Sequence, residues 1–280
     1  MKLLRSLAVA LALGASTLSA HAGNVLIVLS DSDRLDLKDG KVFKTGFYLN
    51  ELMQPVKALL DAGHEVTFAT PKGMAPSVDR TSIDKMYFGG DEAAMKASEA
   101  QLSELGLMSS DKSPVISLAR VEQIGYDHFD AVYVPGGHAP MQDLLVSSEL
   151  GKLLRYFHDK GKTTALACHG SIALLSTLPD AEEYVAKFET AGTATAQTDW
   201  IYAGYKFTVF SNQEEEMAKG LLGGGEMKFY PQDALTQAGG QFIQANAPFD
   251  GHVVMDRELI TGQNPASAPA VAQELLSRLK

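Results

Sequence analysis

The sequence predicts an α/β protein whose mostly parallel sheet is covered by helices on both faces. The first observation is a set of uninterrupted apolar runs of strand length, which are typical of strands buried on both faces of a sheet. The second is that apolar residues at helical spacing separate the first two runs, as in a βαβ unit with a right-handed crossover. The third is an ordinary globular composition, since 25 glycines and 11 prolines in 280 residues exclude collagen-like and low-complexity chains.

The first 22 residues are expected to form a signal peptide. Lys2 and Arg5 precede an apolar run, Leu7 to Leu13, that is too short to span a bilayer. Ala20-His21-Ala22 then offers the small residues of a cleavage site. The alternative is a buried N-terminal helix, which no later apolar stripe supports. We therefore expect a mature domain of residues 23–280, located in the bacterial periplasm and not attached to the membrane.

The mature chain opens with a strand, a helix and a second strand. Asn24 to Ser30 is an apolar run, Leu49 to Leu60 has helical spacing and stops before Gly63, and Glu65 to Thr70 is the second run. Residues 71–125 are polar and mixed instead. We interpret them as a mostly helical insertion after the second strand, which serves as a lid or a dimer element.

The remaining elements continue the same alternation. Strands are expected at Asp130–Pro135, Thr163–Ala167, Lys206–Phe210, Val253–Asp256 and Glu258–Thr261. Helices are expected at about Met141–His158, from Cys168 through Leu175, from Ser211, and at Ser267–Leu279. No internal repeat or linker-like stretch divides the chain, so a single domain is expected.

Charge and cysteine content narrow the possible functions. The 24 basic and 34 acidic residues give a net charge of −10, which argues against a nucleic-acid partner. A single cysteine excludes an intramolecular disulfide and any cysteine-cluster metal site, but it permits a catalytic thiol. We expect neither a metal nor another cofactor.

Cys168 is the strongest candidate for a catalytic residue. It follows a predicted buried strand directly and precedes a helix, and a nucleophile at such a turn lies at the carboxyl edge of the sheet, where α/β folds bind ligands. The helix N-terminus favours the thiolate, so a pKa below neutrality is predicted. The alternative is a buried structural cysteine, the common fate of an unpaired thiol.

Two further motifs are candidates to act with Cys168: the adjacent His169 and the glycine turn that ends at His138. His169 is a candidate base, although on an ideal helix its side chain would point about 100° away from that of Cys168. It could equally be a partly buried histidine with only structural contacts. Pro135-Gly136-Gly137-His138 ends the neighbouring strand, and its glycines allow an inward N–H of the oxyanion-hole kind or simply a tight turn.

Four carboxylates need separate interpretations. Glu51 lies four residues before Pro55, which lacks the N–H for the Glu51 carbonyl, so the helix should kink or begin anew there. Such a kink could aim Glu51 into the site, although most helix glutamates are solvated. Ser211 and Glu214 have the spacing of a capping box, which leaves Glu215 and Glu216 unassigned, although acidic residues in a first helical turn are favourable in any case.

These motifs together resemble the ThiJ/PfpI superfamily over nearly the whole mature chain. The resemblance rests on the Ala-Cys-His-Gly elbow, the Pro-Gly-Gly turn, the segment Thr45 to Glu51 with Pro55, and the closing segment Leu259 to Ser267. It implies a flavodoxin-like sandwich fold, related to class I glutamine amidotransferases. The closing segment and Phe210-Ser211 are most similar to the glyoxalase III-like chaperone branch.

The resemblance implies a role for each site residue. Cys168 would be the nucleophile, His169 the triad histidine, Glu215 the carboxylate that orients it, and Glu51 a protonated hydrogen-bond donor to the thiolate. The N–H groups of Gly137 and His169 would form the oxyanion hole.

The expected activity is a cofactor-free, glutathione-independent glyoxalase that converts methylglyoxal-type dicarbonyls to 2-hydroxy acids through a cysteine hemithioacetal. Protein deglycation, a homodimer and a role in stress response belong to the same expectation. The alternatives are a cysteine amidase or peptidase, and a non-catalytic holdase chaperone or oxidative-stress sensor.

Overall fold

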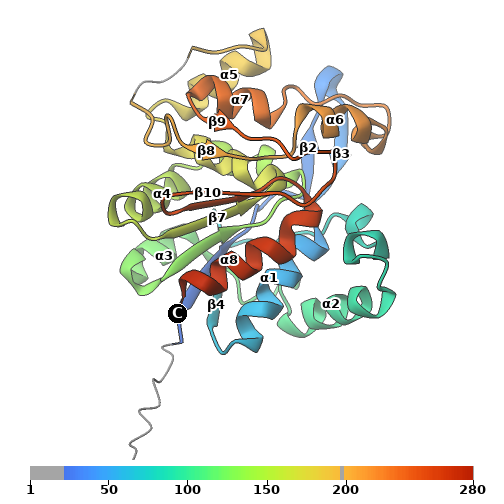
Figure 1. The fold of residues 1–280 in the computed structure, drawn as a ribbon, viewed down its shortest axis with the longest axis vertical. Coiled ribbons are helices and arrows are strands. Elements are labelled where there is room, and N and C mark those ends of the chain that lie inside the picture. Colours follow the sequence, from blue (N-terminus) through green and yellow to red (C-terminus); the bar gives the residue numbers. More distant parts are fainter. Residues whose placement is uncertain (1–21, 196–198, 280) are drawn as a thin grey trace, which may run out of the picture.

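A seven-stranded sheet lies at the centre of the computed structural model, which describes residues 22–195 and 199–279 (Figure 1). Its strand order is β10-β11-β7-β6-β1-β4-β5, and only β10 and β11 run antiparallel to each other. The strands are β1 (Asn24–Val28), β4 (Glu65–Thr70), β5 (Ile116–Ser117), β6 (Ala131–Val134), β7 (Thr163–Ala167), β10 (Val253–Asp256) and β11 (Leu259–Gly262). The predicted mostly parallel sheet is confirmed.

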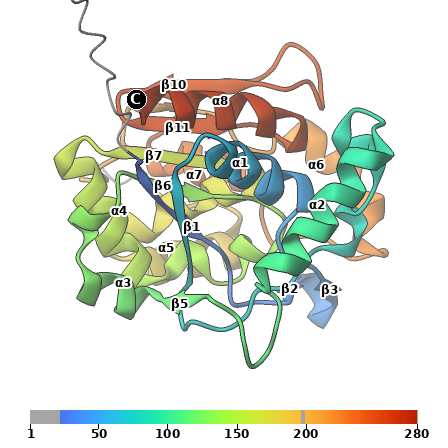
Figure 2. The same ribbon diagram turned by 90° about the horizontal axis from the view of Figure 1, so that it is seen from below.

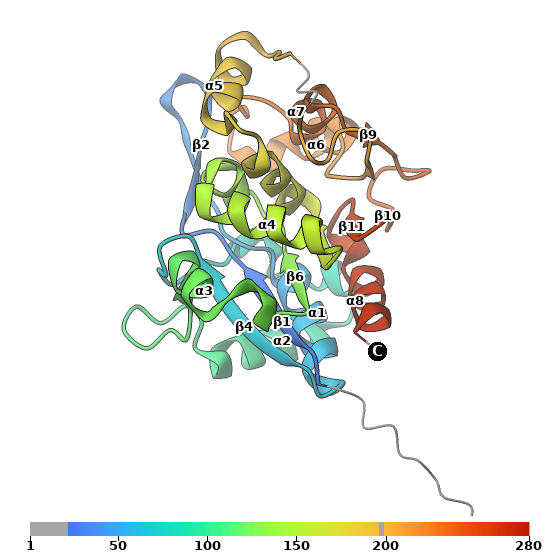
Figure 3. The same ribbon diagram turned by 90° about the vertical axis from the view of Figure 1, so that its left-hand side faces the viewer.

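Helices cover both faces of this sheet (Figures 2 and 3). On one face α1 (Leu49–Asp61) and α8 (Ala268–Arg278) lie side by side, and α2 (Glu92–Leu105) packs outside α1. On the other face lie α3 (Leu118–Ile124) and α4 (Ser148–Lys160). The flavodoxin-like layering that the sequence predicts is therefore present.

The central strand β1 shows why its apolar run is uninterrupted. Leu26 and Val28 pack into the core beneath α3 and α4, whereas Val25 and Ile27 pack into the core beneath α1 and α8. Successive side chains of a strand point to opposite faces, so a strand with a core on each side needs apolar residues at every position.

Smaller elements lie outside the central sheet, in the upper part of Figure 1. They are the hairpin β2 (Arg34–Asp36) and β3 (Val42–Lys44), the pair β8 (Lys206–Phe207) and β9 (Gln241–Phe242), and the helices α5 (Ala181–Ala191), α6 (Asn212–Ala218) and α7 (Pro231–Ala238). The 3-10 segment η7 (Cys168–Thr177) follows β7 without a gap. Segment η7 and helix α6 meet at the edge at which β7 ends, where His169 is hydrogen-bonded to Glu215. Strand β8 lies beside β10 instead, with the Lys206 N–H donating to Asp256.

Three predicted elements differ from the structure. The segment expected as an insertion, residues 71–125, also contains β5 and α3, which belong to the sheet and its helical cover. The expected strand 206–210 extends only over β8 and pairs outside the central sheet, because the Thr208 N–H donates to the Thr261 hydroxyl instead. The helix expected from Met141 starts at Ser148, because the Ser147 hydroxyl caps it by accepting from the Leu150 N–H.

The expected signal peptide lies, apart from Ala22, outside the described residues. Among the residues that are described, no helix has the length and apolar character needed to cross a membrane.

Candidate active site

Cys168 occupies a strained turn at the carboxyl end of β7. Its φ angle is +52°, a left-handed conformation that side-chain-bearing residues seldom adopt and that often marks functional turns. The chain can turn there because Gly170 packs against the backbone of β6: a Cβ at this position would lie 2.6 Å from the carbonyl oxygen of Pro135. The turn places the thiol, with only 2% of the residue exposed, above the sheet edge.

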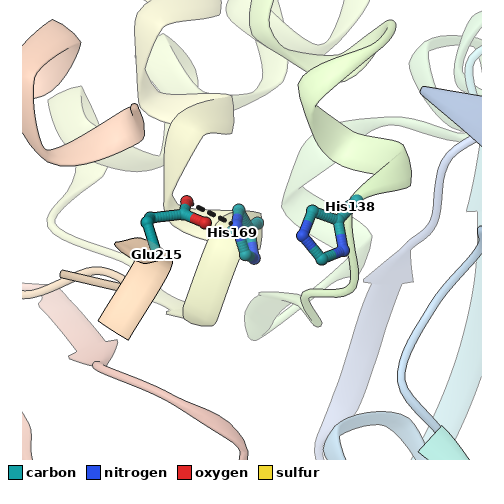
Figure 4. A group of neighbouring side chains, drawn as sticks. All are labelled: His138, His169 and Glu215. Atoms are coloured by element: carbon teal, nitrogen blue, oxygen red, sulfur yellow. Dashed lines mark hydrogen bonds and ion pairs between the residues drawn. The ribbon is translucent and has the colours of Figure 1, made fainter. Parts of the chain in front are cut away.

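His169 connects the thiol to a carboxylate. Its Nδ1 atom lies 3.4 Å from the Cys168 sulfur, and its Nε2 atom lies 2.8 Å from Oε1 of Glu215. Figure 4 shows the second contact, with Glu215 entering from the first turn of α6. Because Cys168 has a positive φ, the two neighbouring side chains meet rather than diverge as they would on an ideal helix.

Burial favours the uncharged form of both members of this pair. It lowers the pKa of His169 to about 3 and raises the pKa of Glu215 to about 8. A neutral imidazole that donates its Nε2 proton to Glu215 leaves Nδ1 free to accept the thiol proton. The geometry therefore suits His169 as a general base toward Cys168.

Glu51 lies beside the thiol, at the start of α1 and fully buried. Its Oε2 atom accepts a 2.7 Å hydrogen bond from the Gly136 N–H, and a Cβ on Gly136 would lie 2.5 Å from that oxygen and 2.7 Å from the Cβ of Cys168. Burial raises the pKa of Glu51 to about 7, against the opposing effects of the Gly136 N–H and the Cys168 thiol. A substantial protonated fraction therefore exists at neutral pH.

Helix α1 continues through Pro55, so of the two predicted outcomes, a kink or a new start, the new start does not occur. The Glu51 carbonyl, which lacks its usual partner because proline has no N–H, accepts a 2.7 Å hydrogen bond from the Tyr133 hydroxyl instead. Tyr133 is fully buried in β6, so the sheet supplies the hydrogen bond that the helix lacks. Sequence reasoning missed this residue because the partners are 82 positions apart.

The thiol itself differs from the sequence-based prediction. Burial raises the pKa of Cys168 well above its ordinary value, and negative charge on Glu51 raises it further, whereas the His169 backbone N–H lowers it. The predicted pKa below neutrality therefore has the wrong direction. A protonated Glu51 removes the second of these causes.

The glycine turn after β6 brings Gly137 and His138 to the same place. Gly137 has a φ of +90°, and a Cβ there would lie 2.0 Å from the Gly46 carbonyl oxygen, so no other residue fits. The ring of His138 lies 4.3 Å, centroid to centroid, from that of His169. Burial, followed by any charge on His169, lowers the pKa of His138 to about 4. The sequence pattern around His138 predicts a glycine turn but no role for its imidazole.

His138, His169 and Glu215 together form a group that could hold a cation, since one ligand atom from each lies within 4.8 Å of the others (Figure 4). Two imidazoles and a carboxylate are ligands that zinc accepts. A cation there would replace the hydrogen bond between His169 and Glu215. It would therefore compete with the proton transfer described above.

The neighbouring Glu214 has a structural role. It completes the predicted capping box with Ser211, which is confirmed. Its carboxylate also accepts from the Phe249 N–H and from the side-chain amides of Gln263 and Asn264. Glu214 therefore holds the closing Thr-Gly-Gln-Asn-Pro segment against α6, while Glu215 faces His169.

A cavity of about 740 Å³ opens above these residues. Cys168, His169 and His138 contribute to its lining, together with Gln54 of α1 and with aromatic and aliphatic side chains from the residue before α1, the segment after β4, α6 and the closing segment. A thiol, a neutral base and a buried carboxyl group next to one cavity can perform addition to a carbonyl followed by proton transfer.

Comparison with known proteins assigns the chain to a family. A family model described as ThiJ/PfpI family-like matches residues 42–214, more than half of the chain. The chain belongs to the ThiJ/PfpI-like family. This match includes Glu51, Cys168 and His169 and ends at Glu214.

Relatives within the ThiJ/PfpI-like family cover nearly the same length. A Schizosaccharomyces pombe protein named a probable glutathione-independent glyoxalase, hsp3103, is 26% identical over 92% of this chain and 98% of its own. A Staphylococcus aureus protein named protein/nucleic acid deglycase HchA is 25% identical over 87% of this chain and 75% of its own. The crystal structure of glyoxalase III from Candida albicans has the same fold, with a TM-score of 0.67 and 20% identity over 93% of this chain and 98% of that one.

Proposed function

We propose that the protein is a glutathione-independent glyoxalase that converts small dicarbonyls to 2-hydroxy acids without a cofactor. The observation that carries the proposal is the buried connection from Cys168 through His169 to Glu215 beside the cavity. The names of the S. pombe and S. aureus relatives support it, and the second of these extends it to deglycation.

The first step forms a carbon–sulfur bond. The Cys168 sulfur attacks the aldehyde carbon while His169 Nδ1, 3.4 Å from the sulfur, takes the thiol proton. The N–H groups of Gly137 and His169 stabilise the developing oxyanion, which then takes that proton from His169 and becomes a hemithioacetal.

The second step moves hydrogen between the two adjacent carbons. Neutral His169 removes the proton from the former aldehyde carbon, and the resulting enediol is protonated on the neighbouring carbon. This gives a cysteine thioester of the 2-hydroxy acid. Water then hydrolyses the thioester, which releases the acid and restores the thiol.

Glu51 acts on the Cys168 sulfur, and Glu215 acts on the His169 imidazole. Protonated Glu51 lowers the negative charge near the sulfur and donates a hydrogen bond to the thiolate as it forms. Glu215 keeps the imidazole oriented with Nδ1 toward the sulfur. Burial raises the pKa of both groups and so favours their protonated forms.

The experiment measures lactate formed from methylglyoxal by purified residues 23–280 without glutathione. Cys168→Ala and Glu215→Gln are expected to reduce kcat by at least ~100-fold, the size typical of losing a nucleophile or its orienting partner. Glu216→Gln is the matched control, because Glu216 lies on the same turn of α6 but is exposed. Lactate formation that is no faster than with Cys168→Ala contradicts the proposal.

A role as an oxidative-stress sensor is less well supported than a role as an enzyme. Thiol oxidation needs a thiolate that solvent reaches, whereas Cys168 is almost fully buried and burial raises its pKa.

The periplasmic location, the signal peptide and the homodimer remain predictions from the sequence. So does the exclusion of nucleic acid, which the name of the S. aureus relative does not favour.

A further inference from the structure

The cavity above Cys168 is much larger than a three-carbon substrate requires. Its volume is about 740 Å³, whereas an apolar cavity of ~150 Å³ is enough to hold benzene. A methylglyoxal bound to the thiol would leave most of this space to solvent.

The chemistry of the lining favours an apolar occupant. None of the residues that line the cavity is a lysine, arginine, aspartate or glutamate. Its walls carry the aromatic side chains of Tyr48, Tyr87, Phe88, Phe210 and Phe249. A phosphate or a guanidinium group would find no charged partner here, whereas a hydrocarbon group would be buried favourably.

The mouth of the cavity is also apolar, although it faces solvent. Four lining residues are large, apolar and exposed: Met86 is 68% exposed, Met217 61%, Leu221 46% and Phe249 43%. They come from the segment after β4, from α6 and the turn following it, and from the loop before β10. Single exposed apolar residues are ordinary, but several gathered around one opening mark a binding surface.

Phe249 is held at this mouth in an unfavourable backbone conformation. Its φ is +65°, and its N–H donates to Oε1 of Glu214 over 2.7 Å. Its ring lies 6.1 Å from that of Phe210, which in turn lies 4.9 Å from the ring of His169. An aromatic wall therefore runs from the solvent-exposed mouth to the base beside the thiol.

We propose that the preferred substrates are α-oxoaldehydes that carry a long aliphatic or aromatic group on the ketone carbon. The aldehyde carbon lies at the Cys168 sulfur, and the apolar group extends along Phe210 and Phe249 to Met86 and Met217 at the mouth. This inference rests on the proposed glyoxalase activity and specifies its substrate class.

The test compares kcat/KM for methylglyoxal, 2-oxohexanal, 2-oxooctanal and 2-oxodecanal. We expect kcat/KM to rise along the series by up to ~4-fold for each methylene that becomes fully buried. Met217→Gln should lower the ratio of kcat/KM for 2-oxodecanal to that for methylglyoxal by at least ~3-fold, because it places an amide beside the tail. Met74→Gln is the matched control, since Met74 is 55% exposed but lies outside the cavity, and it should leave the ratio unchanged.

A kcat/KM that stays constant or falls with chain length overturns the inference while leaving the glyoxalase proposal intact.

If no oxoaldehyde is turned over, the glyoxalase proposal fails, and the cavity is tested separately with unreactive ketones. 2-Decanone should then slow alkylation of Cys168 by iodoacetamide at concentrations at which acetone does not. Equal protection by the two ketones, or none by either, would count against an apolar binding site.

Discussion

The carboxyl group of Glu51 connects protonation with stability at a single residue. Its pKa rises from an ordinary value of 4.5 to about 7 on folding, mainly because the group is buried. The folded state therefore holds a proton that the unfolded chain has released between these two pH values. Stability from this group is complete below pH 4.5 and is lost as the pH rises through about 7.

Glu51→Gln should therefore be more stable than the wild type at pH 8 by up to ~3 kcal/mol, since each pKa unit is worth ~1.4 kcal/mol. The amide keeps an acceptor for the Gly136 N–H and carries no charge. The advantage should vanish below pH 4. Denaturant unfolding of both proteins across this range measures it, and a difference that does not depend on pH would contradict a buried, titrating Glu51. Turnover by the variant should be poor, because the exchangeable proton is gone.

The group formed by His138, His169 and Glu215 predicts how metal ions affect the enzyme. Because the proposed chemistry uses no cofactor, dialysis against a chelator should leave the rate of lactate formation unchanged. Added micromolar Zn²⁺ should inhibit, because a cation bound by these side chains occupies the imidazole that must accept the thiol proton.

His138→Asn serves as the comparison in this experiment, because it removes one ligand while keeping the contact between His169 and Glu215. Its inhibition by Zn²⁺ should require a higher concentration of the ion. Activity that is lost on chelation and restored by Zn²⁺ would show that the proposed cofactor-free mechanism is wrong.

At the scale of elements, two adjacent glutamates of α6 have different roles. Glu214 accepts hydrogen bonds from Ser211, Phe249, Gln263 and Asn264, so it joins three segments of the chain. Glu215 has its hydrogen bond to His169. The sequence pattern explained the capping contact of Glu214 but not the contacts with residues 35 to 50 positions away.

Glu214→Ala should therefore destabilise the protein by ~3 kcal/mol or more, because several buried donors lose their acceptor at once. A lost capping contact alone would cost only ~1 kcal/mol. Glu215→Gln should change the free energy of unfolding little and reduce kcat strongly. Thermal or denaturant unfolding and turnover of both variants distinguish these effects. Exchange of the two phenotypes would reverse the assignment of the two residues.

The sequence predicted best the features that local patterns determine. Uninterrupted runs such as that of β1, the glycine turn at Gly137 and the Ser211 cap each depend on neighbouring residues, and the structure contains all three elements. Features that depend on distant contacts were missed. The lengths of β8 and α4 are set by Thr261 and by the Ser147 cap, and the thiol pKa is set by burial from several elements.

At the scale of the whole molecule, the export prediction concerns the first 22 residues, which lie outside the segment that the family model matches. If residues 1–22 are a signal peptide, the protein purified from its native host should begin at Gly23 and should be released by osmotic shock. Intact-mass measurement of that protein checks the N-terminus. A mass that retains the first 22 residues would refute the prediction, whereas the fold of residues 23–280 would be unaffected.

The hydrogen bond between the Tyr133 hydroxyl and the Glu51 carbonyl has a consequence for how such sequences diverge. Tyr133 compensates for Pro55, because the proline leaves a buried carbonyl without its helix donor and the tyrosine hydroxyl supplies one. Losing Tyr133 alone leaves that carbonyl without a donor, whereas losing Pro55 alone restores an N–H and leaves the hydroxyl its acceptor, since a carbonyl oxygen accepts two hydrogen bonds. Evolutionary replacements at the two positions should therefore be correlated in one direction. Across the family, a proline at the position of Pro55 should accompany a hydroxyl-bearing side chain at that of Tyr133, and relatives without the proline should be free to carry phenylalanine.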